Sequence, residues 1–292
     1  MIKWNWFAIT INNSKNNYFN RINSKLSYKK QKKDNWNKQL KLSFAEDKSY
    51  TSKNKFFNDF YSNEYITFVN YVEKNIDKDK NILSIGSGRG IGELKLIEKG
   101  YNITLSDLDY PSGLKRLKKI FNKFNYIKFD IFKDSLKKKY DYIICCNLVY
   151  AFDKKKLSTF FFKTQKLLKN DGFLLLSPGG STLSIYKRVY NQIYLPLENF
   201  IYFVILKITN RNCSLKKFHH GFIYSDKEII EIALKKNYFL SQKIYRDDNL
   251  TEYNMSKIIP HLITKSVVIG YFFKLLGNKL PFLNFFSFKK LR

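Results

Sequence analysis

The sequence predicts an α/β fold, a three-layer sandwich in which helices cover both faces of a mostly parallel seven-stranded sheet with an antiparallel last strand. From residue 81 onward, short apolar runs alternate with amphipathic stretches, which is the order that βαβ units produce. Two runs, 143–146 and 173–176, show no polar alternation, as parallel strands covered on both faces do. The first run, 81–85, leads directly into a glycine-rich turn.

The region before this alternation predicts an N-terminal helical extension. Residues 1–54 are rich in Lys and Asn and show little periodicity, so we expect a loose arm with at most one short helix. Over 56–72, apolar residues recur at three- and four-residue steps, which predicts an amphipathic helix. In the alternating region that follows, we expect strands at 81–85, 101–106, 126–129, 140–146 and 172–177, and helices at 91–99, 114–121 and 154–168.

The pattern changes after residue 180. Aromatic and basic residues fill 181–218, where we predict a helical insertion. Ser225 and Glu228 then have the spacing of a capping box, which predicts a helix over 225–236. The segments 239–245 and 265–273 are candidates for two last strands. We therefore divide the chain into an N-terminal arm and helix (1–78), a cofactor-binding core (79–180), an insertion or cap (181–218), the rest of the core sheet (219–275) and a basic-aromatic tail (276–292).

The charge of the chain is strongly positive, with a formal net charge of +29 at pH 7. Such a charge suits nucleic acid or an anionic membrane surface. However, only seven of the 53 Lys and Arg residues are Arg, the side chain that bidentate contacts to phosphates and bases favour. We therefore expect a solvated basic surface, and a nucleic-acid partner stays open without being favoured.

The cysteines indicate a reducing compartment. There are three of them, Cys145, Cys146 and Cys213, and none forms a CxxC pair. We therefore expect no metal site and a cytoplasmic location. The sequence shows no signal peptide and no uninterrupted apolar run of about 20 residues, so no transmembrane helix is expected, while peripheral membrane contact stays open.

Polar or glycine-rich features follow four consecutive predicted strands. The loop 86–90 follows the first, Asp107 the second, Asp130 the third and Asn147 the fourth. In an open parallel sheet, ligands bind beyond these carboxyl ends. Glycines let the backbone approach a ligand closely, and a carboxylate can accept hydrogen bonds from both hydroxyls of a ribose. These features therefore predict a nucleoside-containing cofactor, with Asp130 placed to meet an adenine amino group.

The spacing of the glycines discriminates between cofactors. Dinucleotide binding expects G-x-G-x-x-G, with the pyrophosphate at a helix N-terminus. Here Gly86, Gly88 and Gly90 form G-x-G-x-G, and residue 91 is Ile. This pattern suits a cofactor without a pyrophosphate and disfavours an NAD-dependent oxidoreductase.

Residues 82–180 resemble the core of the class I S-adenosylmethionine-dependent methyltransferases, which implies a Rossmann-like fold. The segments that carry the resemblance, in the family's order and spacing, are 82–90 (ILSIGSGRG), 104–107 (TLSD), 129–131 (FDI), 140–147 (YDYIICCN) and 167–175 (LLKNDGFLL). The family usually has an acidic residue two positions before its first motif glycine, and this chain has Ser84 there. Ser84 can form a hydrogen bond but supplies no charge for the cofactor's amino group, so affinity would be lower unless another group substitutes.

The resemblance implies S-adenosyl-L-methionine as the cofactor and assigns a role to each motif. The three glycines would line the methionine part, Asp107 would bind the ribose, and Asp130 with Ile131 would bind the adenine. The full set of predicted cofactor-binding residues is Ser84, Gly86, Ser87, Gly88, Gly90, Asp107, Leu108, Asp130, Ile131 and Asn147.

The expected reaction is an in-line methyl transfer to a small molecule or to a glycan or lipid intermediate. A base is needed only if the acceptor must lose a proton, and the candidates are His219, His220 and Tyr150. The histidines precede the helix predicted from Ser225, and Tyr150 follows the fourth strand. An RNA methyltransferase and a non-catalytic S-adenosylmethionine-binding module are the alternatives, and the sequence does not predict an oligomeric state.

Overall fold

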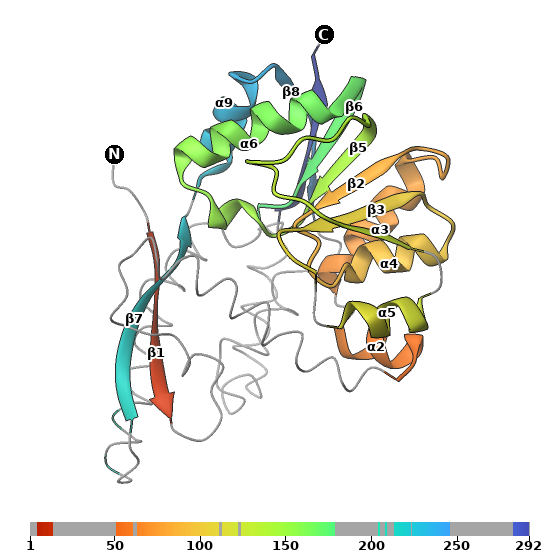
Figure 1. Ribbon diagram of the computed structural model, residues 1–292. Helices are drawn as coiled ribbons and strands as arrows, with labels where there is room; N and C mark the ends of the chain where they lie inside the picture. Colours follow the sequence, from red (N-terminus) through yellow and green to blue (C-terminus); the bar gives the residue numbers. More distant parts are fainter. Residues whose placement is uncertain are drawn as a thin grey trace, which may run out of the picture.

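A seven-stranded sheet forms the centre of the protein, in the order β4-β3-β2-β5-β6-β9-β8 (Figure 1). The computed structural model describes residues 5–13, 51–60, 63–110, 113–121, 124–178, 204, 208, 213–222, 224–245 and 283–291. The strands of this sheet are β2 (Ile82–Ile85), β3 (Ile103–Asp107), β4 (Asn125–Lys128), β5 (Tyr140–Cys145), β6 (Leu168–Leu176), β8 (Tyr238–Tyr245) and β9 (Leu283–Lys290). Neighbouring strands from β4 to β6 pair in parallel, whereas β9 is antiparallel to both β6 and β8.

Helices cover both faces of the sheet, so the predicted three-layer sandwich with an antiparallel last strand is confirmed (Figure 1). The helices are α2 (Lys53–Phe60), α3 (Asn63–Asn75), α4 (Ile91–Glu98), α5 (Leu114–Ile120), α6 (Lys154–Leu167) and α9 (Asp226–Leu234). Alternation along β2 divides the core into two apolar layers. Leu83 and Ile85 belong to the layer that includes α6 and α9. Ile82 belongs to the layer of α2, α3, α4 and α5.

The seventh strand lies where the sequence indicated a tail. Strand β9 falls inside 276–292, and the candidate strand 265–273 lies outside the described residues. The tail prediction was wrong for 283–290 because the lysines that end this segment resemble a solvated terminus. The strand is nevertheless an interior strand of the sheet, between β6 and β8. Phe286 and Phe288 are fully buried in one layer, and Phe285 is buried in the other.

A separate two-stranded sheet joins distant parts of the chain. Strand β1 (Asn5–Asn13) pairs antiparallel with β7 (Cys213–Phe222). The prediction of a loose N-terminal arm was therefore wrong for 5–13, and the prediction of a helical insertion was wrong for 213–218. Residues 1–4, 14–50, 181–203, 205–207 and 209–212 of these two regions lie outside the described part. Two strands that pair across some 200 residues give no local periodicity that marks them as partners.

The helices predicted at 91–99, 114–121, 154–168 and 225–236 agree with the structure. The helix expected over 56–72 is two helices, α2 and α3. The capping box is present as predicted: Ser225 Oγ accepts the Glu228 N–H at 3.2 Å, and the Glu228 carboxylate accepts the Ser225 N–H at 2.9 Å. This reciprocal pair fixes the start of α9.

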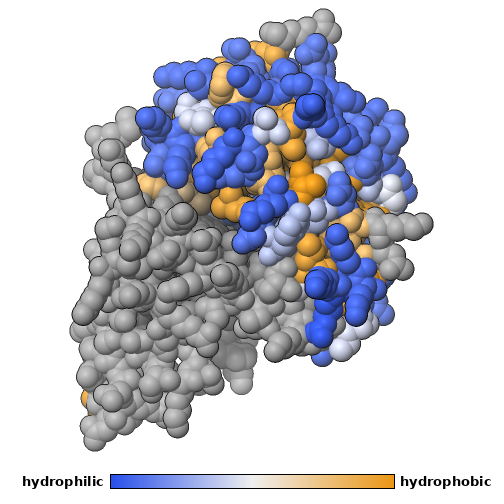
Figure 2. Space-filling model, viewed as in Figure 1, coloured by the Kyte–Doolittle hydropathy of each residue, from blue (hydrophilic) through white to orange (hydrophobic). Residues whose placement is uncertain are grey.

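The described surface is mainly hydrophilic on the face that Figure 2 shows, with apolar residues between the polar ones. Among the described residues, no helix has both the length and the apolar character needed to cross a membrane.

We predict that Phe288→Ala lowers the free energy of unfolding by about 3–5 kcal/mol, because it empties a fully buried site. The Phe288 ring lies 5.6 Å from Phe161 and 6.3 Å from Tyr238, between centroids. The matched control is Phe239→Ala on the neighbouring strand, where the side chain is 54% exposed and the expected loss is below about 1 kcal/mol. Urea unfolding measures both, and equal losses would contradict a core role for β9.

Candidate functional site

The loop between β2 and α4 turns on three glycines with positive φ. The φ angles are 68° at Gly86, 55° at Gly88 and 64° at Gly90, a region that residues with a Cβ rarely adopt. A Cβ at Gly86 would lie 2.8 Å from Leu148 Cδ2, so this glycine lets the loop after β5 pack closely. A Cβ at Gly88 would have no atom of the described residues within 4 Å, apart from its own chain neighbours. The middle of the loop therefore presents bare backbone to open space.

The Asp107 carboxylate, at the end of β3, fixes this loop. Its Oδ2 accepts the Gly88 N–H at 2.9 Å, and its Oδ1 accepts the Leu108 N–H at 2.6 Å. Burial raises the pKa of Asp107, and these two backbone donors oppose that rise. Each oxygen keeps a further acceptor site, so the carboxylate can still bind hydroxyl groups.

Tyr126, on β4, holds the same glycine from its other side. Its hydroxyl donates to the Gly88 carbonyl at 3.0 Å. Burial, together with the charge of Asp107, raises the pKa of Tyr126, so it stays a neutral donor. Tyr126 was not among the predicted site residues, because a tyrosine inside a predicted strand looks like ordinary core.

Beneath the loop lies a second buried carboxylate, that of Glu93 in the first turn of α4. Ser84 Oγ donates to Glu93 Oε1 at 2.7 Å, and Ser106 Oγ donates to the Ser84 carbonyl at 2.7 Å. Glu93 is only 3% exposed, and Ser84 is fully buried. Burial raises the pKa of Glu93, while the hydrogen bond from Ser84 lowers it in part. Sequence reasoning also missed Glu93, although its place three residues after Gly90 was visible.

Leu108 follows β3, and Asp130 and Ile131 follow β4; these are the residues predicted to contact the nucleoside of the cofactor. Leu108 is 50% exposed beside Asp107 and offers an apolar surface there. Asp130 Oδ1 accepts the Phe132 N–H at 2.9 Å, and Oδ2 lies 3.6 Å from Lys133 Nζ. Ile131, predicted as an apolar shelf for adenine, is 4% exposed and packs in the core. Its role toward a cofactor stays a prediction.

Three further predicted residues lie at the same edge of the sheet, two of them after β5 and one in the glycine loop. Asn147 has a φ of 53°, and its Oδ1 accepts a hydrogen bond from Ser177 Oγ at 3.3 Å. Ser87, in the glycine loop, donates its N–H to the Ser106 carbonyl at 3.0 Å. Tyr150 lies in the short 3₁₀ helix η2 (Val149–Ala151) that follows.

The candidate histidines precede α9, as predicted, and lie in strand β7. His219 pairs with Phe7, and His220 falls where the register of the two strands shifts. Strand β7 lies beside η2, so the structure brings the elements that carry His219, His220 and Tyr150 together. A strand at this position was not expected, because its partner β1 is far away in the sequence.

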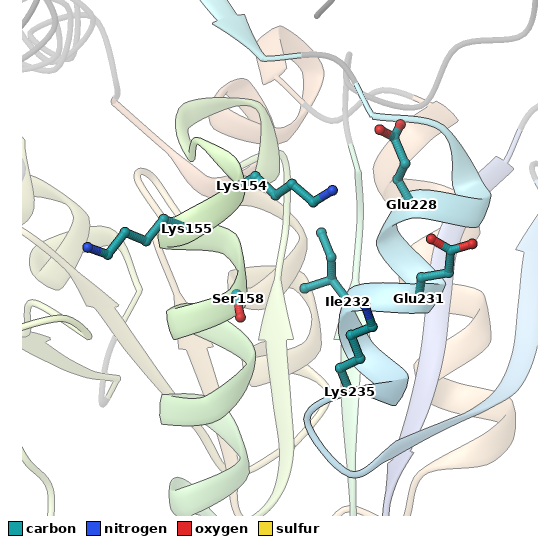
Figure 3. Close-up of a pocket in the computed structure, with 7 residues that line it drawn as sticks. All are labelled: Lys154, Lys155, Ser158, Glu228, Glu231, Ile232 and Lys235. Atoms are coloured by element: carbon teal, nitrogen blue, oxygen red, sulfur yellow. The ribbon is translucent and has the colours of Figure 1, made fainter. Parts of the chain in front are cut away.

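A surface groove of about 440 Å³ separates α6 from α9 (Figure 3). Lysine, serine and glutamate side chains with one isoleucine line it, namely Lys154, Lys155, Ser158, Glu228, Glu231, Ile232 and Lys235. These residues belong to the two helices or, in the case of Lys235, to the C-cap of α9, and none lies at the carboxyl end of a strand. The groove is therefore distinct from the constellation around the glycine loop. In the described part of the chain, no group of His, Cys, Asp and Glu is placed to hold a metal ion.

Comparison with known proteins places this constellation in context. A family model described as a methyltransferase domain matches residues 57–205. No relative among curated protein sequences matches the chain.

Solved structures share the fold. A magnesium protoporphyrin IX methyltransferase from Synechocystis PCC 6803, with bound S-adenosylmethionine, is 11% identical with a TM-score of 0.51, over 92% of this chain and 99% of that one. The N-methyltransferase NodS from Bradyrhizobium japonicum, with S-adenosylhomocysteine, is 12% identical with a TM-score of 0.50, over 87% and 99%. An S-adenosylmethionine-dependent methyltransferase from Clostridium acetobutylicum is 12% identical with a TM-score of 0.50, over 79% and 92%.

We predict that Glu93→Gln is more stable than the wild type at neutral and higher pH. Burial raises the pKa of Glu93 above its ordinary 4.5, so the folded protein holds this proton more tightly than the unfolded chain. The stability that depends on this proton is fully present below pH 4.5 and is lost as the pH rises through the raised pKa. Glutamine has no proton to lose.

Urea unfolding at about pH 4 and about pH 8 checks this, because only the second condition should separate the variant from the wild type. The control is Glu98→Gln on the same helix, which removes a surface ion pair with Lys53 (2.8 Å) and should not stabilise at high pH. A Glu93→Gln protein less stable than the wild type at about pH 8 would contradict a costly buried carboxylate.

Proposed function

From the premise that this chain belongs to the family of methyltransferase domains, we propose that it transfers a methyl group from S-adenosylmethionine to a small-molecule acceptor. It is a class I S-adenosylmethionine-dependent methyltransferase, and S-adenosylmethionine is its cofactor. The observation that carries the proposal is the glycine loop held from both sides, by Asp107 at the Gly88 N–H and by Tyr126 at the Gly88 carbonyl.

The residues at this edge of the sheet fit the cofactor. The open space at Gly88 leaves room for the methionine part, since no side chain among the described residues lies within 4 Å of a Cβ placed there. The Asp107 carboxylate can accept from the ribose hydroxyls. Asp130 would bind the adenine amino group, and Leu108, half exposed, would cover an apolar face of the nucleoside. Asn147, which follows β5, would lie toward the methyl group and its acceptor.

When bound, the cofactor supplies a sulfonium methyl group and leaves as a neutral thioether. The protein then has to align the acceptor and exclude water, which can supply much of the rate. If the acceptor atom must lose a proton, Tyr150, His219 and His220 are the candidates to take it. Their elements η2 and β7 lie side by side beyond β5, which supports an acceptor site there.

A similar solved structure supports a small-molecule acceptor. The similar structure named as a magnesium protoporphyrin IX methyltransferase has a small-molecule acceptor, and this supports the same class here. A glycan or lipid intermediate stays a narrower prediction, as does the cytoplasmic location expected from the cysteines.

We predict that Asp107→Asn weakens binding of S-adenosylhomocysteine by about 10- to 100-fold, because one charge-assisted acceptor is lost. Isothermal titration calorimetry measures the Kd. The control is Asp109→Asn, whose side chain is 62% exposed and pairs with Lys128, and it should change the Kd less than about twofold.

Titration of the wild type with NAD completes the test, and we expect no binding because the glycine spacing provides no pyrophosphate site. Binding of NAD in preference to S-adenosylhomocysteine would overturn the proposed function.

A further inference from the structure

Position 84 is where this chain departs from its family, and the structure shows what stands beside it. Ser84 is on β2, two residues before Gly86, and Glu93 is on α4, three residues after Gly90. Their side chains are joined by a hydrogen bond of 2.7 Å, and both are buried. The Glu93 carboxylate therefore lies directly beside the Ser84 side chain, where the family usually has its own acidic group.

We propose that Glu93, held by Ser84, supplies the negative charge that attracts the cofactor's amino group, so that the acidic group of this site has moved from the strand to the helix. The inference rests on the proposed function, because it concerns one part of the same cofactor. It goes further by assigning the ammonium-recognising charge to a residue outside every motif that carried the resemblance.

The electrostatics of the buried pair support a cationic ligand. A buried carboxylate is costly unless a cation or several donors compensate it. Among the described residues, no lysine, arginine or histidine forms an ion pair with Glu93, and its one side-chain donor is the neutral Ser84 hydroxyl. A glutamine would accept the same hydrogen bond without the cost of a charge. An ammonium group bound above the loop would give this charge a partner in a region of low dielectric.

A second reading is that the Ser84–Glu93 bond only docks α4 on β2. The two readings differ in what Glu93→Gln does. Glutamine keeps the acceptor oxygen and nearly the same shape, so a docking role would survive, whereas an electrostatic role would not. They also differ between ligands, because 5′-methylthioadenosine has the nucleoside and the sulfur of the cofactor but lacks its amino and carboxylate groups.

The experiment titrates wild type and Glu93→Gln with S-adenosylhomocysteine and with 5′-methylthioadenosine by isothermal titration calorimetry. We expect Glu93→Gln to weaken S-adenosylhomocysteine about 10-fold or more, and to change 5′-methylthioadenosine less than about twofold. Equal S-adenosylhomocysteine affinity, or equal losses for the two ligands, would overturn the assignment. Glu98→Gln is the matched control on the same helix and should leave both affinities unchanged.

A double variant, Ser84→Asp with Glu93→Gln, returns the charge to the strand. We expect it to recover the S-adenosylhomocysteine affinity to within about threefold of the wild type. A double variant that folds, by its thermal transition, yet binds no better than Glu93→Gln would count against the exchange of positions. If the wild type binds neither ligand, the proposed function fails and this assignment with it, whereas a loss shared by both ligands in Glu93→Gln removes the assignment alone.

Discussion

The hydrogen bond from the Gly88 N–H to Asp107 is the interaction on which the site depends. It joins the middle of the glycine loop to the end of the neighbouring strand, and Tyr126 holds the carbonyl of the same residue. Glycine loses more conformational freedom on folding than any other residue. Without these two contacts, a loop with three glycines would therefore have few interactions that favour one backbone conformation. Side chains from β3 and β4 therefore order the loop, in addition to the turns that its own glycines allow.

This arrangement concentrates buried negative charge at one edge of the sheet. Burial raises the pKa values of both Asp107 and Glu93, so each ionised carboxylate lowers the stability of the free protein. Binding sites often keep groups that cost stability because a ligand compensates them. The proposed cofactor has groups that fit both carboxylates. Its ribose hydroxyls can donate hydrogen bonds to Asp107, and its positively charged amino group can compensate the negative charge of Glu93.

The sequence predicted the parts of this molecule that have a local signature. The buried strands around 81–85 and 140–146, the glycine loop and the capping box at Ser225 are confirmed because short-range patterning determines them. What it missed depends on contacts between distant residues. Three features were missed: the pairing of β1 with β7, the position of β9 between β6 and β8, and the contact of Tyr126 with Gly88. Each joins segments that are distant in the sequence, and no local periodicity marks such segments as partners.

The alternation of side chains along a strand determines which helix can contact position 84. A residue that replaces the acidic group of this position has to come from that helix, as Glu93 does. Leu83 and Ile85 belong to the apolar layer under α6 and α9, so alternation directs Ser84 to the opposite face. That face is covered by α4, among others, and α4 is the helix into which the glycine loop leads. A residue near its start is therefore close to position 84 both along the chain and in space. An acidic group lost from this strand position could be replaced most directly from the first turn of α4, which is where Glu93 lies.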